Sequence, residues 1–132
     1  MKPITTEWIE KAESDYKAAA VLRNEPERVY DAISFHAQQC VEKYLKAWLS
    51  ECEIDFPRTH DLEALTKLAS SSLAGLEKLL DDLRFLTSFA VEIRYPGITA
   101  EEQDAERCWQ ILGRARDLIR KGLNVGSDEE PS

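Results

Sequence analysis

Five polar side chains have the types and the spacing of a phosphate-binding surface: Gln39, Lys43, Lys46, His60 and Arg94. Lys43 and Lys46 lie within about 60° of each other on a helix, because successive helical residues turn by about 100°. Gln39 falls on the same side, and His60 and Arg94 reach it from other segments. Together with Arg58, the two lysines and Arg94 would bring a charge of +4 to this surface. Such a cluster focuses a positive potential even on an acidic protein.

An ordinary structural role is open to each of these residues as well. Two pairs on the same helix are one turn apart and would support a solvated face: Gln39 with Lys43, and Glu42 with Lys46. His60 can fix a turn through a nearby carbonyl or carboxylate, and Arg94 can bond the last carbonyls of a helix. His36 falls on the helix flank, where a surface or interface position is expected. Both interpretations stay open.

Other signatures of catalysis and of metal binding are absent from the sequence. It has no glycine-rich phosphate loop, Walker-type GK[ST], HExxH or paired-cysteine motif, and only two histidines. We therefore assign no catalytic residue, no metal and no cofactor. The three cysteines, Cys40, Cys52 and Cys108, are expected to be reduced thiols, as is usual in a cytoplasmic protein.

Length and charge narrow the classes of function further. The chain has 132 residues, about the length of one domain, and a net charge of −8. Binding to the backbone of nucleic acids or to anionic membranes depends on positive charge, so this balance argues against a protein that coats either. No apolar run reaches the length of a membrane span or resembles a signal peptide. We expect a cytoplasmic protein without a membrane partner.

Hydrophobic residues recur with the period of a helix along nearly the whole chain, and strand-like alternation is nearly absent. The pattern predicts an all-α protein of about five helices: residues 7–23, 27–51, 60–69, 76–93, and a fifth that ends at Gly122. Threonine is the predicted cap of three of them: Thr5 or Thr6, Thr59, and Thr99 in a capping box with Glu102. Pro96 and Gly97 stop the fourth helix.

The fifth helix and the segment after it are polarised in charge. Its basic residues gather toward the end: Arg107, Arg114, Arg116, Arg120 and Lys121. The helix macrodipole favours this order, and we prefer that explanation to an RNA-binding patch. Residues 1–123 are predicted to form a single domain, and residues 124–132 a disordered acidic tail.

Three segments, taken in order, carry a family resemblance. The second predicted helix contains Gln39-Cys40-Val41-Glu42-Lys43, a turn reads Thr59-His60-Asp61-Leu62, and the fourth helix ends in Arg94-Tyr95-Pro96. Over about residues 8–123 the chain resembles the HEPN family (higher eukaryotes and prokaryotes nucleotide-binding domain). The resemblance implies an up-and-down helical bundle, usually a dimer. It also implies a frequent partner, a small nucleotidyltransferase, in some cases within a toxin–antitoxin couple.

Many HEPN proteins are ribonucleases, which carry an arginine and, four to six residues later, a histidine near the dimer interface. This sequence departs from that pattern, because the positions that follow Arg94 at this spacing are Thr99, Ala100 and Glu101. RNA cleavage by such a pair needs a group that titrates near neutral pH beside a cation. The departure therefore predicts a domain without nuclease activity.

The resulting expectation is a HEPN-like, non-catalytic homodimer that binds a nucleotide or a nucleic-acid phosphate and partners a nucleotidyltransferase. The expected ligand-binding residues are Gln39, Lys43, Lys46, His60 and Arg94. Two alternatives remain: a divergent ribonuclease that uses Arg94 with His36 or His60, and a purely structural interaction protein.

Overall fold

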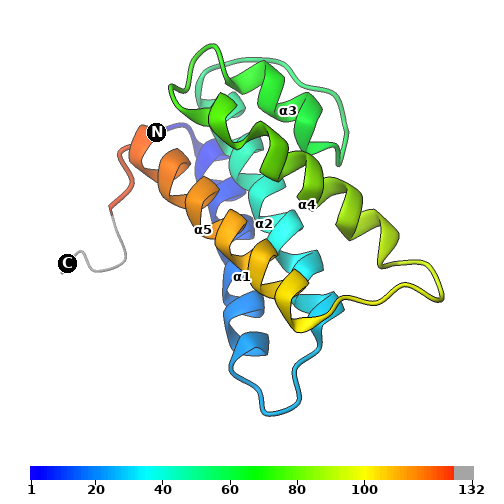
Figure 1. The fold of residues 1–132 in the computed structure, drawn as a ribbon. Coiled ribbons are helices and arrows are strands. Elements are labelled where there is room, and N and C mark those ends of the chain that lie inside the picture. The colour runs from blue at the N-terminus through cyan, green and yellow to red at the C-terminus, as the bar shows by residue number, and fades with distance from the viewer. Residues whose placement is uncertain (127–132) are drawn as a thin grey trace.

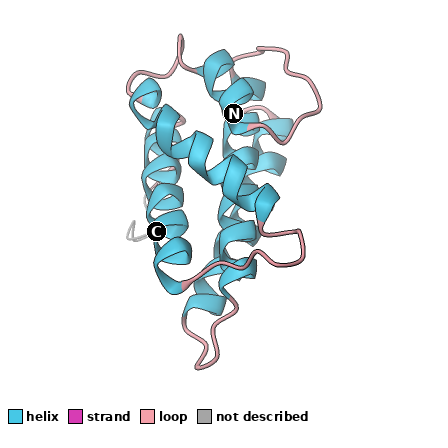
Figure 2. Ribbon diagram, turned by 45° about the vertical axis from the view of Figure 1, so that its right-hand side comes forward, coloured by secondary structure: helices cyan, strands magenta, loops and turns pink. Residues whose placement is uncertain are grey.

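The longest helix, α2, lies at the centre of the molecule and packs against every other α-helix. The structure is a computed structural model that describes residues 1–126. Its elements in chain order are α1 (Pro3–Arg23), α2 (Tyr30–Glu51), α3 (Leu62–Ala69), the 3-10 helix η1 (Leu76–Leu79), α4 (Leu80–Glu92) and α5 (Glu102–Gly122). The described residues contain helices and loops only, as Figure 2 shows, which confirms the predicted all-α class.

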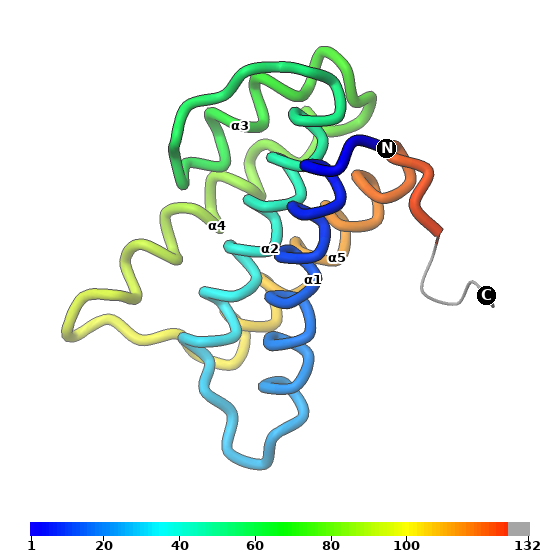
Figure 3. The backbone as a smooth tube through the Cα atoms, turned by 180° about the vertical axis from the view of Figure 1, so that it is seen from behind, coloured from blue at the N-terminus to red at the C-terminus, as the bar shows by residue number. Residues whose placement is uncertain are grey.

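The long helices alternate in direction. In Figure 1, α1 runs down, α2 runs up, α4 runs down obliquely across α2, and α5 runs up again. Helix α3 and η1 connect α2 to α4 at the upper end. Figure 3, from behind, shows α1 in front of α2. The expected up-and-down bundle is therefore confirmed, with α2 as its central member.

The core explains why α2 takes this place. Its side chains Tyr44, Leu45 and Leu49 are fully buried, together with Leu112 and Ile119 of α5. Burial of each such leucine or isoleucine stabilises the fold by about 1.5–3 kcal/mol. Because other helices surround α2, its polar positions are also enclosed, and this determines the character of the candidate site.

Helix α1 begins four residues earlier than predicted. Pro3 occupies the first turn, where a proline costs no hydrogen bond. Thr5 therefore lies inside the helix and does not cap it; it is buried and its hydroxyl donates to Glu51 Oε1 at 2.8 Å. The same oxygen accepts from the backbone N–H of Lys2 at 3.0 Å. The end of α2 thus caps α1, a long-range contact that no local pattern contains.

The predicted caps of the other helices are also displaced. Asp61, not Thr59, caps α3, and its side chain accepts from the Glu63 N–H at 2.9 Å. The capping box of α5 lies two residues beyond the predicted one, where Asp104 Oδ2 accepts from the Glu101 N–H at 2.9 Å. An acidic side chain replaces threonine at both helix starts, which suits the positive end of the helix dipole.

Two glycines with left-handed torsion angles lie in the turns before η1 and after α4. The predicted helix 76–93 is divided into η1 and α4, and it is preceded by Gly75 with φ of +92°. Gly97 also has φ of +92°, which confirms it as the turn residue after Pro96. Residues that carry a Cβ atom rarely adopt this left-handed backbone conformation, so both positions favour glycine.

Helix α5 ends at Gly122, as predicted, but the residue with left-handed torsion angles after it is Asn124, with φ of +57°. Gly122 has a further role in packing. A Cβ atom at Gly122 would come within 2.8 Å of Leu73 Cδ1 and 2.9 Å of Trp48 Cζ3. The glycine is therefore required by a close approach of α5 to α2.

Gly122→Ala should lower the free energy of unfolding by about 1–3 kcal/mol, because overpacking in a dense core costs about that much. Urea unfolding monitored by circular dichroism measures it. Gly113→Ala is the matched control on the same helix, since nothing lies within 4 Å of a Cβ there. Equal stability of the two variants would contradict the role assigned to Gly122.

The start of the predicted tail is held against the bundle. The Val125 N–H donates to the Arg120 carbonyl at 2.9 Å, and the Val125 side chain packs against the core. Residues 127–132 of the predicted tail lie outside the described residues. Among the helices of residues 1–126, none is long and apolar enough to cross a membrane.

Candidate functional site

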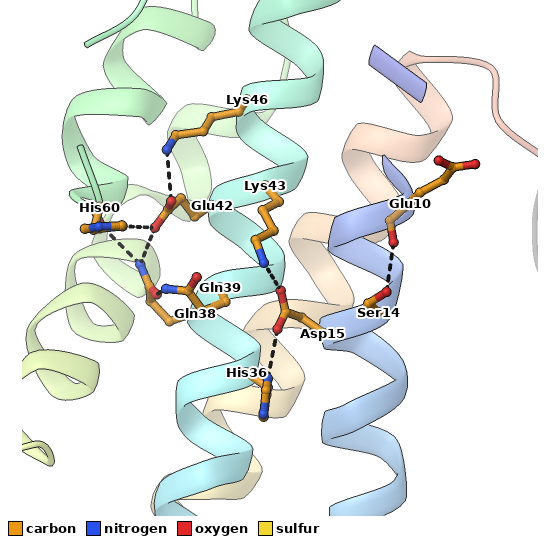
Figure 4. Close-up of polar contacts among 10 residues, drawn as sticks. All are labelled: Glu10, Ser14, Asp15, His36, Gln38, Gln39, Glu42, Lys43, Lys46 and His60. Atoms are coloured by element: carbon orange, nitrogen blue, oxygen red, sulfur yellow. Dashed lines mark hydrogen bonds and ion pairs between the residues drawn. The ribbon is translucent and has the colours of Figure 1, made fainter. Parts of the chain in front are cut away.

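Two buried carboxylates organise the polar face of α2. Asp15 of α1 binds His36 and Lys43, and we call these three residues the first triad. Glu42 of α2 binds His60 and Lys46, and we call these the second triad. Figure 4 shows the two triads side by side along α2, the first toward α1 and the second toward the loop that carries His60.

The first triad joins α1 to α2 and stays open to solvent. Lys43 Nζ lies 2.6 Å from Asp15 Oδ2, and His36 Nδ1 lies 2.8 Å from Asp15 Oδ1. The Asp15 side chain is 11% exposed, whereas those of Lys43 and His36 are 24% and 31% exposed. A buried anion therefore holds two nitrogen-bearing groups at the surface.

The second triad is more deeply buried. Lys46 Nζ lies 2.9 Å from Glu42 Oε2, and His60 Nδ1 lies 2.9 Å from Glu42 Oε1. The side chains of Glu42 and Lys46 are only 4% and 9% exposed, and Lys46 also lies over the Trp8 ring at 5.4 Å. Only His60, at 78%, reaches solvent freely. This triad mainly ties the loop before α3 to α2.

Glutamines complete the second triad. Gln38 Nε2 donates to the His60 carbonyl at 3.0 Å and lies 3.3 Å from Glu42 Oε1. Gln39 Nε2 donates to Gln38 Oε1 at 2.8 Å. Of the predicted ligand-binding residues, the structure thus connects Gln39, Lys46 and His60 in one network and places Lys43 in the neighbouring one.

The remaining predicted residue, Arg94, lies apart from both triads. It follows α4, and its guanidinium lies 5.1 Å from the centre of the Phe35 ring. A shallow depression between α2 and α4 is lined by Asp31, Ala32, Phe35, Ala90, Ile93 and Arg94. Arg58, which the expected cationic cluster also included, is exposed in the loop before α3.

Two sequence-based interpretations need correction. The polar side of α2 is not a solvated face, since Glu42 and Lys46 are buried, although their predicted one-turn pairing is confirmed. The charge of +4 is also reduced, because Asp15 neutralises Lys43 and Glu42 neutralises Lys46. The cause in both cases is the enclosure of α2 by the other helices.

Sequence reasoning missed Asp15 and Gln38. A usable signal exists for Asp15, which falls on the buried stripe of α1 between Ala12 and Ala19, both fully buried. A carboxylate at an apolar position of a helix is rarely buried without a partner. No comparable local signal identifies Gln38, since its burial follows from the loop that covers α2.

The basic end of α5 contributes to the interior and not only to the helix dipole. Arg116 is 6% exposed and makes a bidentate pair with Glu13, with distances of 2.8 and 2.9 Å. Tyr44, fully buried, donates its hydroxyl to Glu13 and accepts from Arg120 at 3.0 Å. Burial raises the pKa of Glu13, but the hydrogen bonds from Arg116 and Tyr44 prevail and lower it overall. Neither a dipole nor an RNA patch accounts for Arg116.

The positions where a nuclease histidine would be expected serve the start of α5. The Ala100 N–H donates to Asp31 Oδ1 at 2.6 Å, and Glu101 is the residue that precedes α5 and joins its capping box. Thr99 is exposed. These residues supply no imidazole near Arg94.

Comparison with known proteins agrees with this fold. The family model described as HEPN domain matches residues 5–122. A solved structure, the crystal structure of ST0689, an archaeal HEPN homologue, is similar with a TM-score of 0.69 and 26% sequence identity. The match covers 92% of this chain and 98% of that one. The search of curated proteins found no match. With the family match spanning nearly the whole bundle, the chain belongs to the HEPN domain family.

Proposed function

We propose that the chain is a HEPN binding module without nuclease activity, which holds the phosphate of a nucleotide or an RNA. The observation that carries this proposal is the first triad, where the ammonium of Lys43 and the imidazole of His36 are both partly exposed at one surface. The remaining proposed ligand contacts are Gln39, Lys46, His60 and Arg94. Of these, His60 and Arg94 are accessible as the protein stands.

Calorimetric titration of the purified chain with nucleoside mono- and triphosphates and a short RNA tests this function. Lys43→Ala and Arg94→Ala should each weaken binding by roughly 10- to 100-fold, because a hydrogen bond to a charged group is worth about 1.5–3 kcal/mol. Arg84→Ala is the matched control, since this exposed arginine pairs with Glu63 and Asp81, which belong to neither triad. No heat with any of these ligands would refute the proposal.

We further propose that the module acts as a homodimer, through the depression beside Phe35. Exposed apolar side chains extend this face: Val29, Val91, Tyr95 and Ile98. The depression carries both an acidic and a basic residue, Asp31 and Arg94. With a two-fold axis beside the depression, Asp31 of one copy can face Arg94 of the second copy, because such an interface pairs each residue with another residue of the same patch. Sedimentation over a range of concentrations tests the dimer.

Co-purification from the native host tests two further proposals: a nucleotidyltransferase partner and a toxin–antitoxin pairing.

One observation favours an alternative function, a divergent ribonuclease. The pairing of Asp15 with His36 orients an imidazole as general acid–base groups are oriented. His60 is oriented by Glu42 in the same way, but the His36 ring contacts the Phe35 ring, over which Arg94 lies, and this favours His36 as the partner of Arg94. Incubation with labelled RNA decides between the two functions: intact RNA supports the binding module, and cleavage that disappears in His36→Ala supports the ribonuclease. Partner co-purification without binding or cleavage would support a structural protein.

A further inference from the structure

Both histidines of the chain have the same bonding pattern, and this pattern determines which nitrogen faces outward. In each triad the Nδ1 atom contacts one oxygen of a buried carboxylate, and the other oxygen binds a lysine. A carboxylate can only accept hydrogen bonds, so Nδ1 must carry the hydrogen. The neutral imidazole then has a bare lone pair on Nε2.

The lone pair matters for the first triad, because the proposed ligand is also an acceptor. An oxygen of a phosphate is repelled by the lone pair on Nε2 of neutral His36. When His36 takes up a proton from solvent at Nε2, the same atom becomes a donor.

The charges around His36 also favour anion binding by its protonated form. On the α1 side, His36 contacts Asp15, and Lys43 of α2 binds the other oxygen of that carboxylate. The His36 ring also contacts the uncharged ring of Phe35. Arg94, which follows α4, lies over the Phe35 ring. Asp15 and Lys43 balance each other, so the triad is neutral while His36 is neutral. Protonation gives it a net charge of +1.

We propose that the first triad is a proton-linked anion site, which binds a phosphate oxygen when His36 Nε2 is protonated. The proposal rests on the proposed function and assigns its regulation. The first triad is the site because Lys43 and His36 reach solvent together, whereas Lys46 in the second triad is nearly buried. Affinity should rise as the pH falls, because ligand binding and protonation of Nε2 favour each other.

The test measures affinity by calorimetry at pH 6 and at pH 8, with a dinucleoside phosphodiester and with sulfate. These probes keep a constant charge over this range, so any pH dependence comes from the protein. One linked proton predicts a lower affinity at pH 8 than at pH 6, with a loss of no more than about 100-fold across these two pH units. Repetition in buffers with different ionisation enthalpies counts the protons taken up. His36→Gln should reduce the change to below about twofold.

The possible outcomes distinguish failure of the proton link from failure of the proposed phosphate-binding function. Equal affinity at both pH values overturns the proton link and leaves the binding function intact. A pH dependence that persists in His36→Gln and disappears in His60→Gln overturns the assignment to the first triad. No binding at either pH overturns the binding function itself. The ¹⁵N shifts of His36 in the unliganded wild-type protein must show hydrogen on Nδ1 and none on Nε2 at pH 8; the reverse overturns the tautomer argument without any variant.

Discussion

Glu42→Ala should lower the free energy of unfolding by about 3–5 kcal/mol. The substitution leaves the ammonium of Lys46, which is only 9% exposed, without its carboxylate. It also removes the acceptor of His60 Nδ1. Removing one partner of a buried ion pair costs this much because the remaining charge stays desolvated and unpaired. Urea unfolding at pH 7, analysed by linear extrapolation, measures the loss.

A second substitution separates the unpaired charge from other effects of Glu42. Glu42→Ala combined with Lys46→Met removes both charges and should recover a large part of the lost stability, since a buried pair is readily replaced by apolar groups. Lys67→Ala is the matched control: it breaks a one-turn pair with Glu63 at 3.0 Å, but this lysine is 63% exposed, and stability should change little. A loss as small as in Lys67→Ala would contradict the buried role of Glu42.

Arg116→Met should lower the free energy of unfolding by about 2–4 kcal/mol. Methionine keeps the packing of the long side chain against the Tyr16 ring, over which the Arg116 guanidinium lies at 3.9 Å. The variant loses both hydrogen bonds to Glu13 and leaves that carboxylate half-buried. The cost lies somewhat below that of a fully buried pair because Glu13 retains 24% exposure. Arg114→Met, at an exposed position of the same helix, is the control.

The same network predicts how stability depends on acid. The pKa of Glu13 is lowered in the folded protein from its ordinary value of 4.5. Its contribution is therefore fully present above about pH 4.5 and is lost as the pH falls through the lowered, folded pKa. Unfolding measured from pH 7 downward should show this loss in the wild type and a smaller one in Arg116→Met. Parallel pH curves for the two proteins would show that Arg116 does not stabilise the ionised form of Glu13.

Helix positions could be predicted well from the sequence, and helix starts poorly, for a physical reason. The 3.6-residue period records which face is buried, and it located every long helix. Caps depend on which donor a particular side chain reaches. The start of α1 is satisfied by Glu51, far away in sequence, and the N–H of Leu62 in α3 by Thr87 Oγ1 at 3.0 Å. No local motif contains such partners.

The candidate site could be predicted as a set of residue types but not as an arrangement. Lys43, Lys46 and His60 could be selected because cations and imidazoles stand out on a polar face. Their charge balance depends on Asp15, which lies on another helix, and on the depth at which Glu42 is buried. Both follow from packing around α2, which periodicity does not encode. The ligand-binding role of these residues stays a prediction.

The segment between α4 and α5 contains the three positions where a HEPN ribonuclease would carry its histidine, and they differ in how strongly the fold constrains them. The Ala100 side chain is buried, so a larger residue there would disturb the packing at the start of α5, and the Glu101 side chain takes part in the capping box. Thr99 is exposed, and four residues separate it from Arg94. Among the three positions at the nuclease spacing, it alone is free to vary. Of these three positions, Thr99 is therefore the one where a histidine would restore the arginine–histidine spacing of the HEPN ribonucleases with the least disturbance of α5.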